Sequence, residues 1–262
     1  MLVLSLFPGI DLLGRGFEKA GFVVVRGPDI IYGGNIRNFK GIAGRFDGII
    51  GGPPCQDFSK ARRSPPTGNG LEMLAEYVRI VKECAPTWWL MENVPTIPTV
   101  QIQGYSHLRL DLNAREFGAE QNRHRHFQFG HAAGLVPIVT RRPITNIDES
   151  QPCCLASEGS RKDRRSWAEF CQLQGLPPDF ELPGMTMEAR YRAVGNGVHV
   201  AVAEAMARAI ATAQSPETKI CECGCGRPVS GRQILATPAC RKRKQRSKCD
   251  SPEMNVHSSV TP

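Results

Sequence analysis

One stretch of the sequence decides the fold, Gly51-Gly52-Pro53-Pro54-Cys55-Gln56-Asp57-Phe58-Ser59. It follows Phe46-Asp47-Gly48-Ile49-Ile50, a short apolar run that predicts a buried strand. Two glycines at the end of a strand allow a sharp turn, and two prolines then hold the backbone extended. A cysteine on so rigid a loop is directed toward a ligand. The alternative is a partly exposed structural thiol.

The residues before this stretch have the pattern of a nucleotide-binding βαβ unit. The apolar runs 2–6 and 22–25 each predict a strand. Between them, the turn Phe7-Pro8-Gly9-Ile10-Asp11 precedes a stretch of helical periodicity that ends at Gly21. In such a unit a ligand lies over the N-terminus of the helix.

Three further motifs follow in a fixed order: Glu92-Asn93-Val94, Gln121-Asn122-Arg123-His124-Arg125 and Gly195-Asn196-Gly197-Val198. Together with the Pro-Pro-Cys stretch, they make the sequence resemble the DNA cytosine-5 methyltransferases over residues 1–212. The resemblance implies an α/β fold of the Rossmann-like type that S-adenosylmethionine-dependent methyltransferases have, here with a small recognition region.

The resemblance also implies a binding site for S-adenosyl-L-methionine. The family's first turn reads Phe-x-Gly-x-Gly-Gly, and here Asp11 and Leu12 replace the later glycines. Asp29 is the candidate for the acidic residue that binds the ribose, and Asn35 stands where the family has an aspartate near the adenine. The expected cofactor-binding residues are Phe7, Gly9, Asp11, Leu12, Asp29, Asn35, Pro53 and Asn196.

The catalytic residues follow from the same resemblance and from the chemistry of cytosine. C5 of this base is too electron-poor to take a methyl group directly, so a Cys55 thiolate is expected to add to C6. Glu92 would hold or protonate N3. Alternation along a strand puts Arg123 and Arg125 on one face, from which both would donate to O2. These atoms are inaccessible in a stacked duplex, so the cytosine must flip out.

The composition favours a polyanionic partner, for which the resemblance implies double-stranded DNA. The 262 residues carry a net charge of +8, although solubility alone is another explanation. The stretch 59–70 is basic and rich in proline and glycine, which predicts either a loop that closes over nucleic acid or an exposed linker. No apolar run approaches the ~20 residues of a membrane span. Four of the ten cysteines cluster near the C-terminus and the rest are scattered, which favours a reduced, cytoplasmic setting. We expect a monomer.

Periodicity and composition divide the chain into successive segments. Helices are predicted over 71–84, 105–117, 167–173, 187–194 and 198–213, with strands over 88–91 and at the end of 121–129. The predicted segments are a catalytic and cofactor-binding core (1–129), a short basic target-recognition region (130–165), the C-terminal part of the core (166–213), a linker (214–220), a Cys-rich element with a basic tail (221–248) and a disordered end (249–262).

The C-terminal element has four cysteines that suffice for a tetrahedral zinc site, Cys221, Cys223, Cys225 and Cys240. So short a segment needs a metal to fold, and the alternative is disorder with free thiols. Six basic residues among positions 241–248 are suited to contacting phosphates.

Two other functions remain compatible with the sequence. These motifs do not exclude an RNA cytosine-5 methyltransferase. The altered glycine turn leaves open a non-catalytic nucleic-acid-binding protein that uses the C-terminal element. For the leading interpretation, a DNA methyltransferase, we expect a role in restriction-modification or self-protection, with a cognate restriction endonuclease as a partner.

Overall fold

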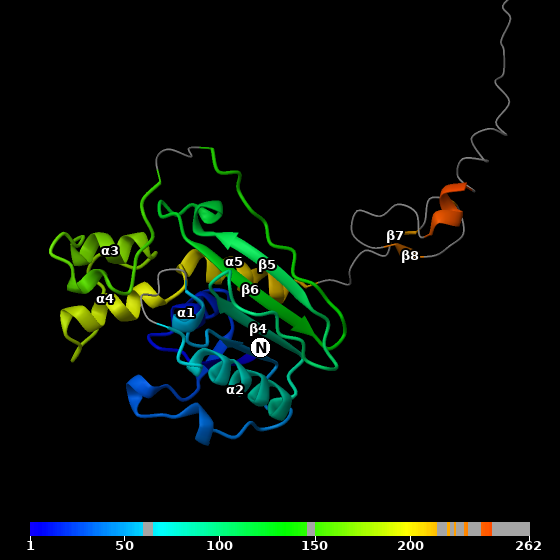
Figure 1. The fold of residues 1–262 in the computed structure, drawn as a ribbon, viewed down its shortest axis with the longest axis horizontal. Helices are drawn as coiled ribbons and strands as arrows, with labels where there is room; N and C mark the ends of the chain where they lie inside the picture. Colours follow the sequence, from blue (N-terminus) through cyan, green and yellow to red (C-terminus); the bar gives the residue numbers. More distant parts are fainter. Residues whose placement is uncertain are drawn as a thin grey trace, which may run out of the picture. The chain divides into compact units, whose positions relative to one another are not determined.

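A six-stranded sheet forms the centre of the unit between Met1 and Ser215 (Figure 1). Its strands lie in the order β2-β1-β3-β4-β6-β5, and β6 is antiparallel to both of its neighbours, while the pairs β1–β2, β1–β3 and β3–β4 are parallel. The bounds are β1 Leu2–Leu6, β2 Val23–Arg26, β3 Gly48–Gly51, β4 Trp88–Asn93, β5 Leu108–Asn113 and β6 His124–His131.

The strand order reverses at β1, because β2 lies on one side of it and β3 on the other. In open α/β sheets, ligands bind at such a reversal, beyond the carboxyl ends of the strands. This topology predicts a site above the ends of β1 and β3, which is where the Pro-Pro-Cys stretch begins.

Helices cover both faces of the sheet. Helix α2 (Asn69–Cys84) packs on the face that carries Leu4, Ile49 and Met91. Helices α1 (Leu12–Lys19), α3 (Trp167–Leu173), α4 (Met187–Asn196) and α5 (Val200–Ala211) contribute to the core on the other face, which includes Val3, Ile50 and Leu90. The two sets of strand residues alternate along each strand, as the pleat of a strand requires.

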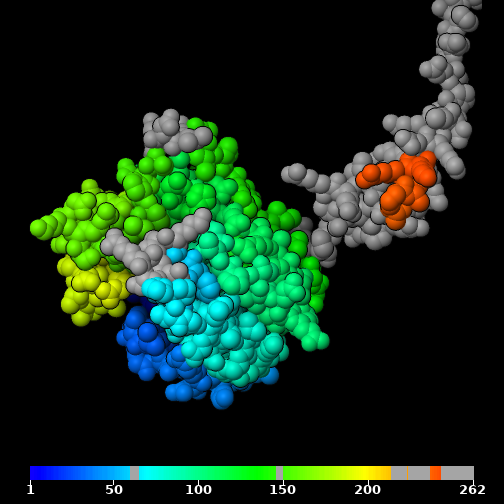
Figure 2. Space-filling view, in the orientation of Figure 1, coloured from blue at the N-terminus to red at the C-terminus, as the bar shows by residue number. Residues whose placement is uncertain are grey.

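Helices α1 and α5 approach each other closely at Gly16. A Cβ atom at this position would lie 2.4 Å from the Cβ of Ala203. The last helix of the core therefore packs on the first βα unit. Figure 2 shows one face of this unit in a space-filling view, on which early segments (blue and cyan) and later segments (light green and yellow) both lie.

The helix predicted over 105–117 is wrong. The structure has the strand β5 there, followed by a 3-10 helix over Ala114–Phe117. Leu108, Leu110 and Leu112 alternate with polar residues, which is the period of a half-buried strand. Pairing with β6 opposes Leu110 to Phe127 and thereby fixes the strand.

This computed structural model describes residues 1–59, 65–145, 150–213, 219–220, 223, 228–229 and 237–242. A second unit runs from Pro216 to Pro262 and holds the antiparallel pair β7 (Lys219–Ile220) and β8 (Pro228–Val229). Cys221 and Cys225 of the predicted zinc site lie outside the described residues, as do the predicted disordered end, most of the basic tail, most of the linker and residues 60–64 of the predicted loop.

The described part of the chain has neither a cluster of metal ligands nor a membrane-spanning helix. No group of three or more His, Cys, Asp and Glu residues could hold a metal ion there. Within the same part, no helix is both long and apolar enough to cross a membrane.

Candidate active site

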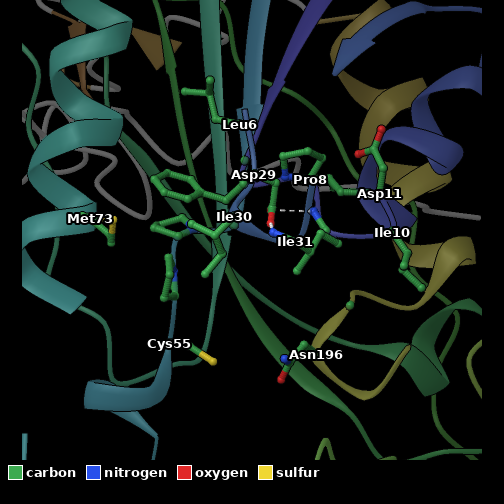
Figure 3. Close-up of a pocket in the computed structure, with 18 of the residues that line it drawn as sticks. Leu6, Pro8, Ile10, Asp11, Asp29, Ile30, Ile31, Cys55, Met73 and Asn196 are labelled. Carbon is green, nitrogen blue, oxygen red and sulfur yellow. Dashed lines mark hydrogen bonds between the residues drawn. The ribbon is translucent and has the colours of Figure 1, made fainter. Parts of the chain in front are cut away.

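A cavity of about 540 Å³ opens at the carboxyl ends of β1, β3 and β4 (Figure 3). Its wall combines the β1–α1 turn, the segment 28–37, the loop after β3 and one side of α4. Apart from Arg123, all the catalytic and cofactor-binding residues predicted from the sequence line this cavity: Phe7, Gly9, Asp11, Leu12, Asp29, Asn35, Pro53, Cys55, Glu92, Arg125 and Asn196.

The β1–α1 turn follows an unusual backbone path, with positive φ at Phe7 (52°), Gly9 (54°) and Asp11 (57°). Glycine adopts this left-handed region without strain, which explains the glycines of the family's turn. Aspartate is one of the few other residues that tolerate it, because its side chain forms local hydrogen bonds. Asp11 Oδ1 accepts from Gly14 N (3.0 Å) and caps α1.

The Asp11 carboxyl group is buried and has partners beyond this cap. Ser5 Oγ donates to Oδ1 at 2.8 Å, and Arg26 Nε lies 2.9 Å from Oδ2. Burial raises the pKa of Asp11, while the Ser5 hydrogen bond and the Arg26 charge oppose this effect. The departure from glycine therefore preserves the shape of the turn and adds an ion pair behind it.

Asp29 joins the turn to the segment that follows β2. Its Oδ2 accepts from Gly9 N (2.9 Å) and its Oδ1 from Ile31 N (3.0 Å). The neighbouring Ile30 is 81% exposed at the edge of the cavity. Asn35 caps the next 3-10 helix by accepting from Arg37 N at 3.0 Å. This side of the cavity thus combines exposed aliphatic carbons with polar groups held at fixed positions.

The loop that carries Cys55 is fixed from below by Asn93, whose Nδ2 donates to Pro53 O at 2.8 Å. The thiol is half-buried, and Figure 3 shows its sulfur pointing into the cavity on the side where Asn196 lies. Burial and the Glu92 charge raise the pKa of Cys55, whereas Arg125 and, to a smaller degree, Arg123 oppose the shift. In this state the thiol is protonated at neutral pH.

Glu92 and Arg125 form an ion pair at the same end of the cavity. Arg125 Nε lies 3.0 Å from Glu92 Oε1, and the two side chains are only 16% and 11% exposed, respectively. Burial raises the pKa of Glu92, opposed by the charges of Arg125 and Arg123. Gly52 leaves room for this carboxyl group, because a Cβ atom there would lie 3.2 Å from Glu92 Oε2.

Arg123 lies away from the cavity, whereas the sequence predicted that it would donate to the cytosine O2. Its guanidinium donates to Cys154 O and Gly195 O (both 2.9 Å), to Gly197 O and to Cys153 Sγ (3.1 Å). Strand β6 begins only at His124, so Arg123 and Arg125 do not share one strand face. Burial lowers the pKa of Arg123 to about 10, and the side chain still anchors both sides of Asn196.

Other residues that support the site were not found from the sequence. Gln121 Nε2 donates to Gln174 Oε1 at 2.6 Å, and Gln174 Nε2 donates to Val194 O at 2.6 Å. Both amides are fully buried and fix the segment before Asn196. Further lining residues at a spacing of about one helical turn lead to Asn196: Met185 just before helix α4, and Ala189, Arg192 and Ala193 on it.

Comparison with known proteins shows a match to one family model. The family model for C-5 cytosine-specific DNA methylase matches residues 1–152 and 141–212. The Type II methyltransferase M.FnuDI of Fusobacterium nucleatum is 32% identical over 168 residues, which are 52% of this chain and 48% of that protein. For M.NgoPII of Neisseria gonorrhoeae the identity is 31%, over 52% of this chain and 49% of that protein. The chain spans about half the length of these curated relatives.

Solved structures support the same fold at lower sequence identity. The methyltransferase EhMeth of Entamoeba histolytica has a TM-score of 0.61 at 12% identity, over 78% of this chain and 96% of that chain. The Dnmt2 methyltransferase of S. pombe has a TM-score of 0.57 at 13% identity, over 80% and 98%, respectively. The α/β methyltransferase fold expected from the sequence is confirmed.

Proposed function

Because the chain belongs to the C-5 cytosine-specific DNA methylase family, we propose that it transfers a methyl group from S-adenosyl-L-methionine to C5 of a cytosine in DNA. One observation carries the proposal. Cys55, Glu92 and Arg125 converge at one end of a cavity whose other walls are the β1–α1 turn and the segment 28–37.

The cavity lining fits S-adenosylmethionine. Ile30 and Ile31 expose aliphatic surface that suits the flat face of an adenine, and the Asn35 amide is beside them. Asp29 stands between this segment and the turn, within reach of a ribose in the same cavity. When bound, the cofactor supplies a sulfonium methyl group as the electrophile.

Cys55 supplies the nucleophile. Its thiolate forms a bond to C6 of the cytosine, which moves electron density to C5 and makes that carbon able to attack the methyl group. With the cofactor bound, C5 would take the methyl group as the bond from that group to the sulfonium sulfur breaks, which would leave S-adenosylhomocysteine. Loss of the C5 proton to a base would then return the electron pair to the ring and break the bond between Sγ and C6. Because the pKa of the thiol is raised in the free protein, its proton must leave when the substrate binds.

Glu92 acts at N3 of the base. Its raised pKa keeps a larger fraction protonated than for an ordinary glutamate, so the carboxyl group can donate to N3 as charge develops in the ring. The ion pair with Arg125 has to rearrange at this step, since the base enters between the loop after β3 and the end of β4.

Arg125 is the donor to the cytosine O2 in this proposal. It lines the cavity, whereas the two terminal amino groups of Arg123 donate to backbone carbonyls away from it. We therefore assign to Arg123 the task of holding the Gly195–Gly197 segment, and with it Asn196, against the cofactor site. Its buried positive charge also favours the thiolate of Cys55.

DNA is the proposed substrate, with the target cytosine flipped out of the duplex. Flipping costs a few kcal/mol, which contacts to the backbone must offset. The exposed cations of the proposed recognition region, 130–165, are available for such contacts: Arg141, Arg142, Arg161, Lys162 and Arg164. Both named relatives are Type II methyltransferases, so we propose restriction-modification or self-protection as the role, with a cognate endonuclease as a partner.

The C-terminal unit remains a separate proposal based on the sequence. Four cysteines, Cys221, Cys223, Cys225 and Cys240, would bind one structural zinc ion and support the basic tail as a DNA contact. Zinc content of the purified protein, measured by inductively coupled plasma mass spectrometry, tests it. One zinc per chain is expected, and a value near zero would contradict the site.

Methyl transfer itself is tested with tritiated S-adenosylmethionine and three nucleic acids: duplex DNA, the same DNA as single strands, and bulk tRNA. Tritium in duplex DNA, released as 5-methylcytosine after digestion, is the expected result. Label confined to tRNA would replace this proposal by the RNA alternative. Binding of DNA without any transfer would favour a non-catalytic protein.

A further inference from the structure

The β1–α1 turn has fewer free backbone N–H groups for binding an anion than such turns usually have. The N-terminus of a helix is an anion site because its amides point outward. Here Gly9 N donates to Asp29 Oδ2 (2.9 Å), Asp11 N to Pro8 O (2.6 Å) and Gly14 N to Asp11 Oδ1 (3.0 Å). Three amides of the turn are thus used by the chain itself, and two of their acceptors are carboxylates.

S-adenosylmethionine has a carboxylate in its amino-acid part, and this group must bind within the cavity. The proposed function puts the sulfonium methyl group near Cys55 and the adenine along the segment 28–37. The amino-acid part must then extend past Asn196, between the β1–α1 turn and helix α4, which line the cavity together. Asp11 is already paired with Arg26, whereas the Asp29 carboxylate accepts from two backbone amides, so an anion beside Asp29 is favoured only if a further cation is near.

Three arginines are among the residues that line the cavity, Arg37, Arg125 and Arg192. Arg125 pairs with Glu92 at the cytosine end. Arg37 holds both carboxylate oxygens of Glu72 at 2.6 and 2.9 Å, on the side of the segment 28–37. Arg192 is the one on α4, about one helical turn before Asn196.

Arg192 is also held more weakly than the other two. Its side chain is 61% exposed and its ion pair is with Glu188, four residues earlier on the same helix, at 2.7 Å. Exposed pairs of this spacing contribute little to stability, so another carboxylate can replace Glu188 with little loss. A guanidinium also matches a carboxylate geometrically through two parallel hydrogen bonds.

We infer that Arg192 binds the carboxylate of the cofactor's amino-acid part and compensates for the turn amides that Asp11 and Asp29 occupy. Glu188 occupies the guanidinium until the ligand arrives. The inference rests on the proposed function, because it takes the cavity to be the S-adenosylmethionine site. It adds Arg192 to the cofactor-binding residues expected from the sequence, of which Asn196 ends the same helix.

Calorimetric titration of the full chain, without DNA, tests the inference with two ligands. S-adenosylhomocysteine carries the amino-acid group, and 5′-methylthioadenosine lacks it. Arg192→Gln should weaken S-adenosylhomocysteine binding by roughly tenfold or more, the usual effect of one charge-assisted pair, and change 5′-methylthioadenosine binding by less than about twofold. Glu188→Gln should leave S-adenosylhomocysteine binding as tight or tighter. Arg208→Gln is the matched control, since Arg208 forms the same kind of pair with Glu204 on α5.

The other outcomes distinguish a wrong assignment of Arg192 from a wrong proposed function. Equal losses for both ligands in Arg192→Gln, or no loss for either, would overturn the assignment of Arg192 while leaving the proposed function intact. An unchanged cofactor affinity combined with weaker DNA binding would assign the arginine to a DNA phosphate and overturn it as well. Wild-type protein that binds neither ligand would remove the proposed function, and this inference with it.

Discussion

Glu92→Gln keeps the size of a side chain that lies beside Arg125 and near Cys55, but removes its charge and its acidic proton. Arg125 Nε lies 3.0 Å from Glu92 Oε1 as an ion pair, and a glutamine oxygen can occupy the same position. The free energy of unfolding should fall by about 1–3 kcal/mol, because the largely buried Arg125 cation keeps a nearby oxygen but loses its counter-charge. Methyl transfer, in contrast, loses its proton donor at N3 and should fall by ~10²–10⁴-fold, the usual contribution of a general acid.

The same substitution should make the Cys55 thiol more reactive. A negative charge opposes deprotonation of a neighbouring thiol, and Glu92 is the second-largest cause of the raised pKa of Cys55, after burial. Removing that charge lowers the pKa of the thiol, so the thiolate forms at lower pH. One variant thus changes two properties of the site in opposite directions.

The assay follows both properties in parallel. Alkylation of Cys55 by iodoacetamide is measured from pH 7 to 10 by mass spectrometry of its peptide, while methyl transfer is followed with tritiated cofactor. The alkylation profile should move to lower pH as turnover falls. Glu204→Gln, which changes a half-buried carboxylate on α5 that pairs with Arg208, should alter neither. Unchanged alkylation with normal turnover would refute the roles given to Glu92.

Three further predictions test the supports of the site. Gly14→Ala should lower the free energy of unfolding, measured by urea denaturation, by about 1–3 kcal/mol, since its Cβ would lie 2.2 Å from Asp11 Oδ2. Adding Asp11→Gly to this variant should offset much of the loss. Additive effects of the two substitutions would contradict the clash. Arg123→Met should destabilise the chain by about 2–4 kcal/mol in the same assay, because it leaves the buried carbonyls of Cys154 and Gly195 without their donor. A stability equal to that of the wild type would show that these contacts are unimportant. Deleting the residues after Gln214 should leave the first unit folded and reduce the salt dependence of DNA binding, and an unchanged slope would mean that the tail contacts no phosphate.

The sequence predicted the part of the site that depends on strand ends. Cys55 and Glu92 follow neighbouring parallel strands, so their meeting in one crevice is a consequence of topology. The catalytic loop needs glycines and prolines for its backbone, and both are visible in the sequence. The same holds for β1, α2 and α3, whose periodic apolar residues are unambiguous.

The features that the sequence did not predict depend on tertiary contacts. Strand β5 is held by its pairing with β6, and the alternation of its leucines covers only the three residues 108, 110 and 112. Arg123 was expected at the base, but its position depends on where β6 begins and on carbonyls that are brought to it from residues 154, 195 and 197. Arg192 reaches the cavity because α4 is oriented by packing, which no local pattern specifies.

The central claim is a transient covalent bond between Cys55 and C6 of the target base, and a mechanism-based trap tests it most directly. In DNA whose cytosines are replaced by 5-fluorocytosine, the fluorine cannot leave C5 as a proton does, so the adduct should persist. We expect a covalent protein–DNA complex that requires S-adenosylmethionine, maps to the Cys55 peptide and is absent in Cys55→Ser. Protein that binds the cofactor and this DNA but forms no adduct, or an adduct retained in Cys55→Ser, would contradict the account.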